Sequence, residues 1–247
     1  MNATTAGAFM KRSIRQTLRR FGLDIHRVGP GRSPDLADFL FARRVDVVLD
    51  VGANLGQFAL GLRDRGYRGK IVSFEPIDSV FRELKAVAER DGNWQTHNFA
   101  LGAVPGRAVL NVSRRSEFSS ILEQSPAALR FDATAAVQRQ EEVTVACLDD
   151  LFAPFRDQIV FLKIDTQGYE RPILEGAREV LSQVVGVQLE LPLVHLYKET
   201  WSLTDALIYM EDAGFVLAQL VPVNCLRDDP VSAIEIDGVF RRRRADE

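Results

Sequence analysis

Residues 45–51 are almost entirely apolar and run directly into a turn that carries two glycines, Gly52 and Gly56. A strand in which nearly every position is apolar is typically buried on both faces, as in the middle of a parallel sheet. The residues after the turn, from about 56 to 65, have helical spacing. A buried strand that turns through glycines into a helix indicates an α/β fold.

The same alternation of short β-branched runs and longer helical segments continues along the chain. It predicts one α/β domain with a mostly parallel sheet, helices on both faces and an antiparallel hairpin at one edge. The expected strands are residues 45–51, 70–75, 94–100, 108–112, 142–148, 159–165, 184–190, 215–221 and 234–240. The expected helices are residues 56–65, 79–90 with Asp78 as the cap, about 172–182, and 203–213. Residues 113–140 lack periodicity and are predicted to form a lid or substrate loop.

Charge divides the chain into two parts, although the formal net charge of its 247 residues is only -3. Residues 1–32 carry seven basic residues and one acidic residue, a net charge of +6, so the remainder carries -9. We therefore expect a basic N-terminal arm, residues 1–40, ahead of a single domain, residues 41–247. An acidic domain argues against a nucleic-acid partner, because binding to phosphates needs a broad basic face.

Cysteine usage and hydropathy bear on the compartment. Cys147 and Cys225 fit neither a disulfide framework nor a zinc motif. No run reaches the roughly 18 apolar residues of a membrane span, and the N-terminus carries charges where a secretory signal is apolar. The sequence therefore favours a cytoplasmic protein.

The N-terminal arm alternates basic residues with apolar ones at near-helical spacing, namely Phe9, Met10, Ile14, Leu18 and Phe21. A basic amphipathic segment can lie on an anionic membrane surface, where a lipid-linked glycan would be met. The same segment can equally pack as a helix on the acidic domain. Peripheral contact with the inner membrane face is thus one of two hypotheses. The sequence leaves the oligomeric state open, a dimer included.

The turn after the first strand has the pattern D-x-G-x-N-x-G, from Asp50 to Gly56. Glycines let the backbone approach a ligand, and the following helix presents free amide donors. An acid ahead of the first glycine would repel a diphosphate but suits the ammonium end of an amino-acid-like cofactor such as S-adenosylmethionine. Glu75 ends the second strand about 20 residues later, where an acid can accept hydrogen bonds from a ribose diol. Singly, the turn also fits a ligand-free connection and Glu75 a solvated strand end, but together they favour a nucleoside cofactor.

In this order, the motifs of the chain resemble those of the FkbM-type S-adenosylmethionine-dependent methyltransferases. The matching strings are DVGANLGQF (50–58), FEP (74–76), NFALG (98–102), VTVACLDDLF (143–152), LKIDTQGYE (162–170), LEGA (174–177), QLELPLVHLY (188–197), GF (214–215) and IDGVFRR (236–242). The resemblance implies the seven-stranded, Rossmann-like class I methyltransferase fold, S-adenosylmethionine as methyl donor, and O-methylation of a sugar, glycolipid or secondary-metabolite hydroxyl. One departure is Gln167, where the family usually has an acid.

The resemblance also implies which residues bind the cofactor. They are Asp50, Gly52, Asn54 and Gly56 at the methionine end, Glu75 at the ribose, Ala100 and Leu101 near the adenine, and Asp165.

Methylation of a hydroxyl requires an aligned oxygen, the exclusion of water and a group that takes the proton. Asp165 and Glu190 end two successive strands, at the edge where crevices open in such sheets, and His195 follows Glu190. We predict these three as the catalytic site, with His195 or Asp165 as general base and Glu190 orienting the substrate. The structural alternatives are a helix cap for Asp165, a surface acid for Glu190 and a packed side chain for His195. Asp165 and Glu190 could instead hold a divalent cation, but this is not favoured because no third ligand is evident.

Two other functions fit parts of the pattern. A nicotinamide-dependent oxidoreductase is disfavoured, because the third glycine of its fingerprint is missing and no Tyr-x-x-x-Lys pair follows the fourth strand. A non-catalytic interaction protein with the same fold is disfavoured by the intact Asp50, Glu75 and Asp165. The leading hypothesis is an O-methyltransferase whose acceptor is a small molecule, glycan or glycolipid.

Overall fold

The computed structural model describes residues 35–226 and 229–244. Nearly all of the predicted N-terminal arm, including its amphipathic pattern, lies outside these residues. The first described helix, α2 (Leu36–Ala42), is capped by the Asp35 side chain, which accepts a hydrogen bond from the Asp38 amide. Phe39 and Leu40 of α2 are buried in a core cluster together with residues of the sheet. The chain is therefore part of the packed domain from α2 onward.

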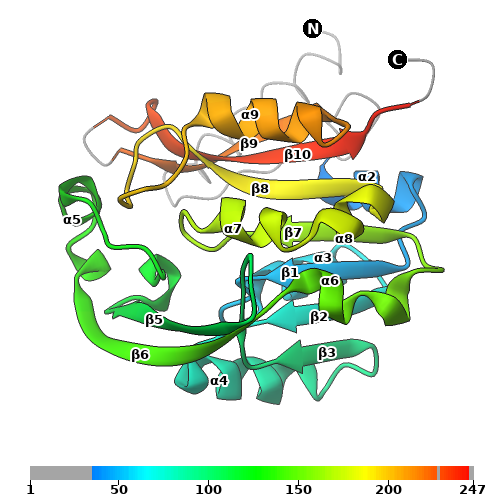
Figure 1. Cartoon of the computed structure of the whole chain (residues 1–247), viewed down its shortest axis with the longest axis horizontal. Coiled ribbons are helices and arrows are strands. Elements are labelled where there is room, and N and C mark those ends of the chain that lie inside the picture. Colours follow the sequence, from blue (N-terminus) through cyan, green and yellow to red (C-terminus); the bar gives the residue numbers. More distant parts are fainter. Residues whose placement is uncertain (1–34, 227–228, 245–247) are drawn as a thin grey trace, which may run out of the picture. The chain divides into compact units, whose positions relative to one another are not determined.

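Seven strands form the main sheet, in the order β3-β2-β1-β7-β8-β10-β9. Their bounds are β1 (Val47–Val51), β2 (Lys70–Phe74), β3 (Trp94–His97), β7 (Val160–Ile164), β8 (Gly186–Pro192), β9 (Phe215–Cys225) and β10 (Ala233–Arg242). The first five strands of this order are parallel, and β10 is antiparallel to both β8 and β9 (Figure 1). The structure thus confirms the predicted mostly parallel sheet with an antiparallel edge hairpin, which is the class I methyltransferase fold.

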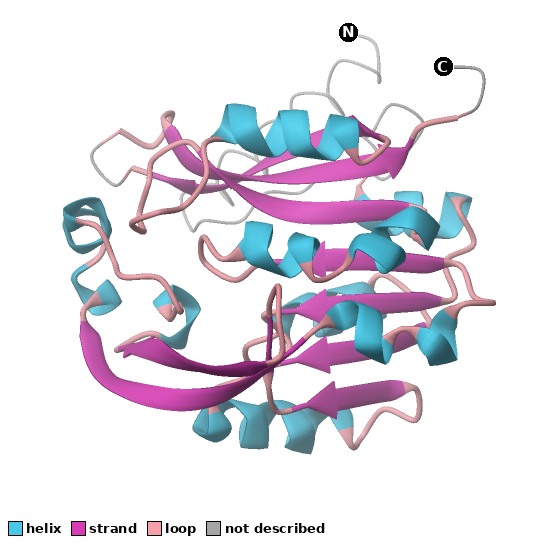
Figure 2. Ribbon diagram, viewed as in Figure 1, coloured by secondary structure: helices cyan, strands magenta, loops and turns pink. Residues whose placement is uncertain are grey.

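Helices cover both faces of this sheet (Figure 2). On one face lie α2, α3 (Gln57–Asp64) and α4 (Asp78–Ala88), whose apolar side chains share a core cluster with Val48 of β1. On the other face lie α6 (Leu148–Leu151), α7 (Glu170–Glu175), α8 (Arg178–Gln183) and α9 (Leu203–Asp212). Their cluster contains Val47 and Leu49. All residues of β1 are buried, as its apolar sequence predicted, because both faces of the strand are covered.

A second sheet of three strands has the order β4-β6-β5. It consists of β4 (Ala100–Leu101), β5 (Gly106–Ser113) and β6 (Val137–Ala146). Between β5 and β6 lie the 3-10 helices η1 (Ser116–Phe118) and η2 (Ala133–Ala135) and the helix α5 (Pro126–Phe131); a third 3-10 helix, η3 (Ala153–Phe155), follows α6. In Figure 1 this green excursion lies on the side to which the arrowheads of β1 and β2 point. The predicted loop 113–140 is therefore partly helical, and its last residues belong to β6.

The predicted strand 94–100 is divided between the two sheets. β3 ends at His97, and the side-chain amide of Asn98 donates to the main-chain oxygens of Glu75, at 3.0 Å, and Pro76, at 3.2 Å. These bonds turn the chain away from β2. Ala100 then pairs with Val145 of β6 in the second sheet.

Two helix predictions were also wrong in detail. Asp78 is the first residue of α4 rather than its cap; the N-cap is Ile77, and Asp78 pairs with Arg82 one turn later. The predicted helix 172–182 is two helices, α7 and α8, because the chain bends at Gly176. A Cβ atom on Gly176 would lie 2.1 Å from the carbonyl oxygen of Gly102, so this contact needs a glycine. Within the described part of the chain, no helix has the length and apolarity to cross a membrane.

Candidate functional site

A cavity of about 530 Å³ opens at the carboxyl ends of the parallel strands, a size typical of small-molecule sites. We call one end of it the turn end, formed by the turn after β1 together with Glu75, Ala100 and Leu101. We call the other the acid end, formed by Asp165, Gln167 and Glu190. The roof segment, residues 113–136, contributes residues 115–121 and 131–132 to the lining.

The turn end depends on a glycine at position 52. Gly52 has a φ of +74°, and a Cβ atom on it would lie 1.8 Å from the main-chain oxygen of Asp165. The amides of Gly52 and Ala53 both donate to the carbonyl of Phe74, each at 3.1 Å. The turn is thereby held between the ends of β2 and β7, and because Gly52 has no side chain, its backbone lines the cavity directly. Gly56 also has a positive φ but packs against Trp94 and does not line the cavity.

Glu75 is nearly buried, 4% exposed, at the end of β2. One carboxylate oxygen accepts from the amide of Asn54 at 2.9 Å, and the other accepts from the amide of Ile77 at 2.8 Å. Burial raises the pKa of Glu75 to about 7, although the two amide bonds act to lower it. Each carboxylate oxygen retains a second lone pair for a ligand. Gly52, Asn54, Glu75, Ala100 and Leu101, all predicted from the sequence, therefore share the turn end.

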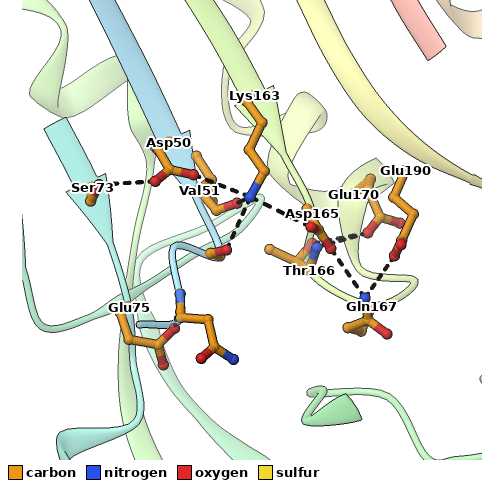
Figure 3. A network of polar contacts seen from close by, with 12 residues as sticks. Asp50, Val51, Ser73, Glu75, Lys163, Asp165, Thr166, Gln167, Glu170 and Glu190 are labelled. Atoms are coloured by element: carbon orange, nitrogen blue, oxygen red, sulfur yellow. Dashed lines mark hydrogen bonds and ion pairs between the residues drawn. The ribbon is translucent and has the colours of Figure 1, made fainter. Parts of the chain in front are cut away.

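Asp50 lies behind the turn and not in the cavity, because it is fully buried. Its carboxylate accepts a hydrogen bond from the Ser73 hydroxyl at 3.0 Å and forms an ion pair with Lys163 Nζ at 3.1 Å (Figure 3). Lys163 Nζ also donates to the carbonyl of Gly52 at 3.1 Å and lies 3.6 Å from Asp165. Burial acts to lower the pKa of Lys163, but Asp50 and Asp165 outweigh it and raise the pKa above the usual value. Asp50 thus supports the turn through Lys163.

At the acid end, a single amide joins two carboxylates. Gln167 Nε2 donates to Asp165 at 3.1 Å and to Glu190 at 2.7 Å (Figure 3). Gln167 Oε1 accepts from the hydroxyl of Tyr197 at 2.8 Å. The side chain of Asp165 is 36% exposed, whereas Glu190 is buried. Burial, with the charges of Asp165 and Glu235 next in size, raises the pKa of Glu190 well above its usual value, so Glu190 holds a proton more readily than an exposed glutamate.

His195 is not part of this arrangement. Its side chain is exposed and does not line the cavity, and its main-chain oxygen accepts from the Ser125 hydroxyl at 2.7 Å. The structure therefore brings together two of the three predicted catalytic residues, Asp165 and Glu190, and leaves the third outside.

The roof segment contacts both ends of the cavity. Asn54 Nδ2 lies 3.0 Å from the hydroxyl oxygen of Ser116, at the turn end. The Ser120 hydroxyl donates to the main-chain oxygen of Gln167 at 2.8 Å, at the acid end. Phe118 is buried in a cluster with Leu196 and other residues, which fixes the segment between these two contacts. The predicted lid or substrate loop is thus a bridge over the cavity.

The described lining carries more acid than base. Five acidic residues, Glu75, Glu117, Asp132, Asp165 and Glu190, face two basic ones, Arg115 and Lys163. Lys163 is already paired with Asp50, and Arg115 lies 3.6 Å from Glu117 and 3.7 Å from Asp132. Because both basic side chains of the described lining already lie beside carboxylates, this lining suits a cationic ligand better than a diphosphate. Among the described residues, no group of three or more His, Cys, Asp or Glu side chains is arranged to hold a metal ion.

Comparison with known protein families gives a match to the Methyltransferase FkbM domain over residues 50–217, about two thirds of the chain. The chain belongs to the FkbM methyltransferase family. The predicted resemblance is confirmed, and the matched range of the FkbM domain includes both ends of the cavity and the roof segment.

Individual relatives of this FkbM domain are distant or short. Methyltransferase 1 of Beauveria bassiana is 23% identical over 188 residues, which cover 69% of the chain and 72% of that protein. The AMB antimetabolite synthetase AmbE of Pseudomonas aeruginosa is 50% identical over 40 residues, 16% of the chain and 2% of the synthetase. The chain thus spans only a small fraction of that synthetase. Among solved structures, Aeropyrum pernix fibrillarin with bound S-adenosyl-L-methionine has a TM-score of 0.46 and 13% identity, covering 79% of the chain and 66% of fibrillarin.

Three roles in the site of this FkbM domain were not predicted from the sequence: Lys163, Gln167 as a bridging group, and Tyr197 as its partner. Lys163 had a usable signal, because a lysine in the buried run Val160–Ile164 of β7 requires a charged partner. Gln167 was recognised only as a departure from the family pattern. Its contacts with Glu190 and Tyr197 had no local signal, since they join segments that are distant in the sequence.

Proposed function

We propose that this FkbM-family protein is an S-adenosylmethionine-dependent O-methyltransferase that acts on a hydroxyl group of a sugar, glycolipid or secondary metabolite. The observation that carries the proposal is that two sets of groups line the same cavity. One end has a glycine turn and a buried glutamate, and the other has two carboxyl groups bridged by an amide. The first end has the groups that a nucleoside cofactor needs, and the second has a proton acceptor for a hydroxyl.

The turn end fits S-adenosylmethionine in shape and in charge. Gly52 and Asn54 line the part proposed for the methionine portion. Glu75 can accept hydrogen bonds from the ribose hydroxyls, and Ala100 with Leu101 offers an apolar wall to the adenine. The two basic side chains of the described lining already have acidic neighbours, which would favour a sulfonium cation and disfavour the diphosphate of a nicotinamide cofactor. S-adenosylmethionine, when bound, supplies a methyl group that is already activated for transfer.

The acid end then has three tasks, which are to bind the acceptor, align its hydroxyl and take its proton. Asp165 is the proposed general base, because its carboxylate is the more exposed of the two and Lys163 lies 3.6 Å away as a compensating cation. Glu190, with its raised pKa, is the proposed hydrogen-bond donor to a neighbouring oxygen of the acceptor. His195 has no role in this proposal, since its side chain lies outside the cavity.

Calorimetric titration with S-adenosylhomocysteine and with NAD tests the cofactor. We expect binding of S-adenosylhomocysteine and none of NAD; the opposite result, or no binding of either, contradicts the proposal. Turnover of labelled S-adenosylmethionine is then measured with free and lipid-linked glycosides, with a chelator present in parallel. Product released as a methyl ether supports O-methylation, whereas methylation of nitrogen or carbon contradicts it. Loss of turnover with the chelator would favour the alternative in which Asp165 and Glu190 bind a cation.

The place of action is a separate part of the proposal. We propose a cytoplasmic enzyme whose basic N-terminal arm brings it to the anionic inner membrane face, in keeping with the net charge of +6 over residues 1–32 against -9 over the remainder. Sedimentation with vesicles of phosphatidylglycerol and phosphatidylcholine tests this. Equal binding of the full chain and of a variant with the arm's basic residues changed to glutamine would contradict a role for the arm.

A further inference from the structure

Gln167 occupies the centre of the acid end. Its side-chain amide donates to Asp165 at 3.1 Å and to Glu190 at 2.7 Å, while its side-chain oxygen accepts from Tyr197 at 2.8 Å. Three polar contacts use both side-chain functions of one glutamine. Because Tyr197 supplies a donor to the oxygen, the amide nitrogen is the atom that faces the two carboxyl groups.

The backbone of Gln167 is fixed as firmly as its side chain. Its φ is +58°, a left-handed conformation that costs a non-glycine residue free energy, and Gly168 follows with a φ of +93°. The main-chain oxygen of Gln167 accepts from the Ser120 hydroxyl of the roof segment at 2.8 Å. A side chain of similar size without an amide would fill the same space but would satisfy neither carboxyl group.

The ionised carboxylate of Asp165 turns toward a neighbouring partner of opposite charge if no other contact holds it. For Asp165 that partner is Lys163, whose Nζ lies 3.6 Å away. A carboxylate turned toward Lys163 would point its free oxygen away from the acceptor. The amide of Gln167 counteracts this rotation from the opposite side.

On this basis, and resting on the proposed function, we propose that Gln167 is a positioning residue that keeps the Asp165 carboxylate directed at the reacting hydroxyl by bridging it to Glu190. Gln167 itself touches neither the methyl donor nor the proton. Its effect passes through Asp165, so removing it should have no further consequence once Asp165 is already changed.

The test uses sinefungin, an S-adenosylmethionine analogue in which a carbon bearing an amine replaces the methylated sulfur. Its ammonium group lies where the methyl group would be. The affinity for sinefungin therefore depends on the orientation of Asp165, and no acceptor is needed for the measurement. We expect the wild-type protein to bind sinefungin about tenfold more tightly than S-adenosylhomocysteine, as a charge-assisted hydrogen bond would give. Asp165→Asn should abolish this preference, and Gln167→Leu should reduce it to about twofold or less. The double variant should lose no more than Asp165→Asn alone.

Three controls separate positioning from a general loss of structure. S-adenosylhomocysteine affinity should change by less than about twofold in Gln167→Leu, because the turn end does not use the amide. Gln167→Asn keeps an amide but is one methylene shorter, so it should also lose the preference; it replaces the leucine variant if that variant does not fold. Gln219→Leu, on β9 and outside the cavity lining, should behave as wild type.

A preference that persists in both Gln167 variants overturns the inference. The inference is also overturned if the losses of sinefungin preference caused by Asp165→Asn and Gln167→Leu multiply in the double variant. A sinefungin preference that remains in Asp165→Asn overturns it as well. If the wild-type protein binds neither S-adenosylhomocysteine nor sinefungin, the proposed function fails instead, and the two failures are thus distinguishable.

Discussion

The two ends of the cavity are built by different means. At the turn end, most of the hydrogen bonds come from main-chain amides. The amides of Asn54 and Ile77 donate to Glu75, and the amides of Gly52 and Ala53 donate to the end of β2. At the acid end, the contacts are between side chains. Gln167, in the turn after β7, bonds Asp165 in the same turn, Glu190 on β8 and Tyr197 in the segment after β8. Rigid backbone suits a cofactor of constant shape, whereas side-chain contacts can differ between members of a fold and so set the acceptor.

Lys163 joins the two ends. Its ammonium group contacts the Gly52 carbonyl on one side and lies 3.6 Å from Asp165 on the other, while Asp50 compensates its charge from behind. A change at either end can therefore be transmitted to the other through this cation, through the roof segment, or through the backbone contact between the turn and Asp165. These contacts predict which substitutions affect one end of the cavity alone and which affect both ends.

Asp165→Asn should have the largest effect and should be confined to the acid end. Loss of a general base lowers kcat by about 10² to 10⁴-fold, while S-adenosylhomocysteine affinity should change by less than about threefold. Both are measured with the labelled-donor assay and calorimetry. Asp157→Asn, at an exposed position outside the cavity lining, is the matched control and should keep full turnover. An affinity loss as large as the loss of kcat would show that the two ends are not separable.

Lys163→Met should affect both ends and the fold itself. It leaves Asp50 buried without its cation, and removing one partner of a buried ion pair costs about 3–5 kcal/mol of the free energy of unfolding. Chemical denaturation measures this. A second change, Asp50→Leu, removes the stranded charge and should restore part of the stability. If Lys163→Met alone is as stable as wild type, Lys163 does not hold the two ends together.

Gly52→Ala should damage the turn end. An alanine here would have to adopt a left-handed backbone conformation, and its Cβ atom would lie 1.8 Å from the Asp165 carbonyl oxygen. Together these two effects lower the free energy of unfolding by about 3 kcal/mol and shift the turn. We expect S-adenosylhomocysteine affinity to fall at least about tenfold. Gly92→Ala is the control, since a Cβ atom at Gly92 would meet nothing within 4 Å. Unchanged affinity in Gly52→Ala would mean that the ligand does not use this turn.

The same difference explains how much could be predicted from the sequence. The turn end follows from a local pattern, because Gly52, Asn54 and Glu75 lie where a buried strand ends and the sheet order brings β1 and β2 together. Asp50 fits the pattern but was misplaced, since a strand residue alternates faces and position 50 points away from the cavity, toward Ser73 and Lys163. The motif alone does not distinguish the two sides.

The acid end could be predicted only in part. Asp165 follows from its position directly after a strand, whereas Glu190 was predicted at the end of a strand that continues to Pro192. His195 was predicted from its distance in sequence to Glu190, but the chain after β8 turns its side chain to the exterior. The roof segment was recognised by its lack of periodicity. Its contacts with Asn54 and Gln167 join residues that are tens of positions apart, and a propensity pattern contains no information about such pairs.

Glu75→Gln should change the dependence of stability on pH. The pKa of Glu75 is raised from 4.5 to about 7 in the folded protein, so the folded state binds the proton more tightly than the unfolded state. Its contribution to stability is therefore present below about pH 4.5 and is lost as the pH rises through 7. Relative to wild type, the variant should gain about 2 kcal/mol between pH 5 and pH 8 in chemical denaturation. Glu89→Gln, at an exposed position, is the control, and its free energy of unfolding should depend on pH as that of wild type does. The same pH dependence in Glu75→Gln would contradict the raised pKa and show that Glu75 is fully charged in the folded protein.

Ser116→Ala should have the smallest effect, because it removes one contact between the roof segment and the turn end. A hydrogen bond of this kind contributes about 1 kcal/mol, so S-adenosylhomocysteine affinity should fall by about fivefold or less, with the sinefungin preference unchanged. Ser182→Ala, on the exposed side of α8, is the matched control. If Ser116→Ala instead reduced the sinefungin preference while leaving S-adenosylhomocysteine affinity intact, Ser116 would support the acid end and not the turn end, and the assignment of its contact with Asn54 to the turn end would be wrong.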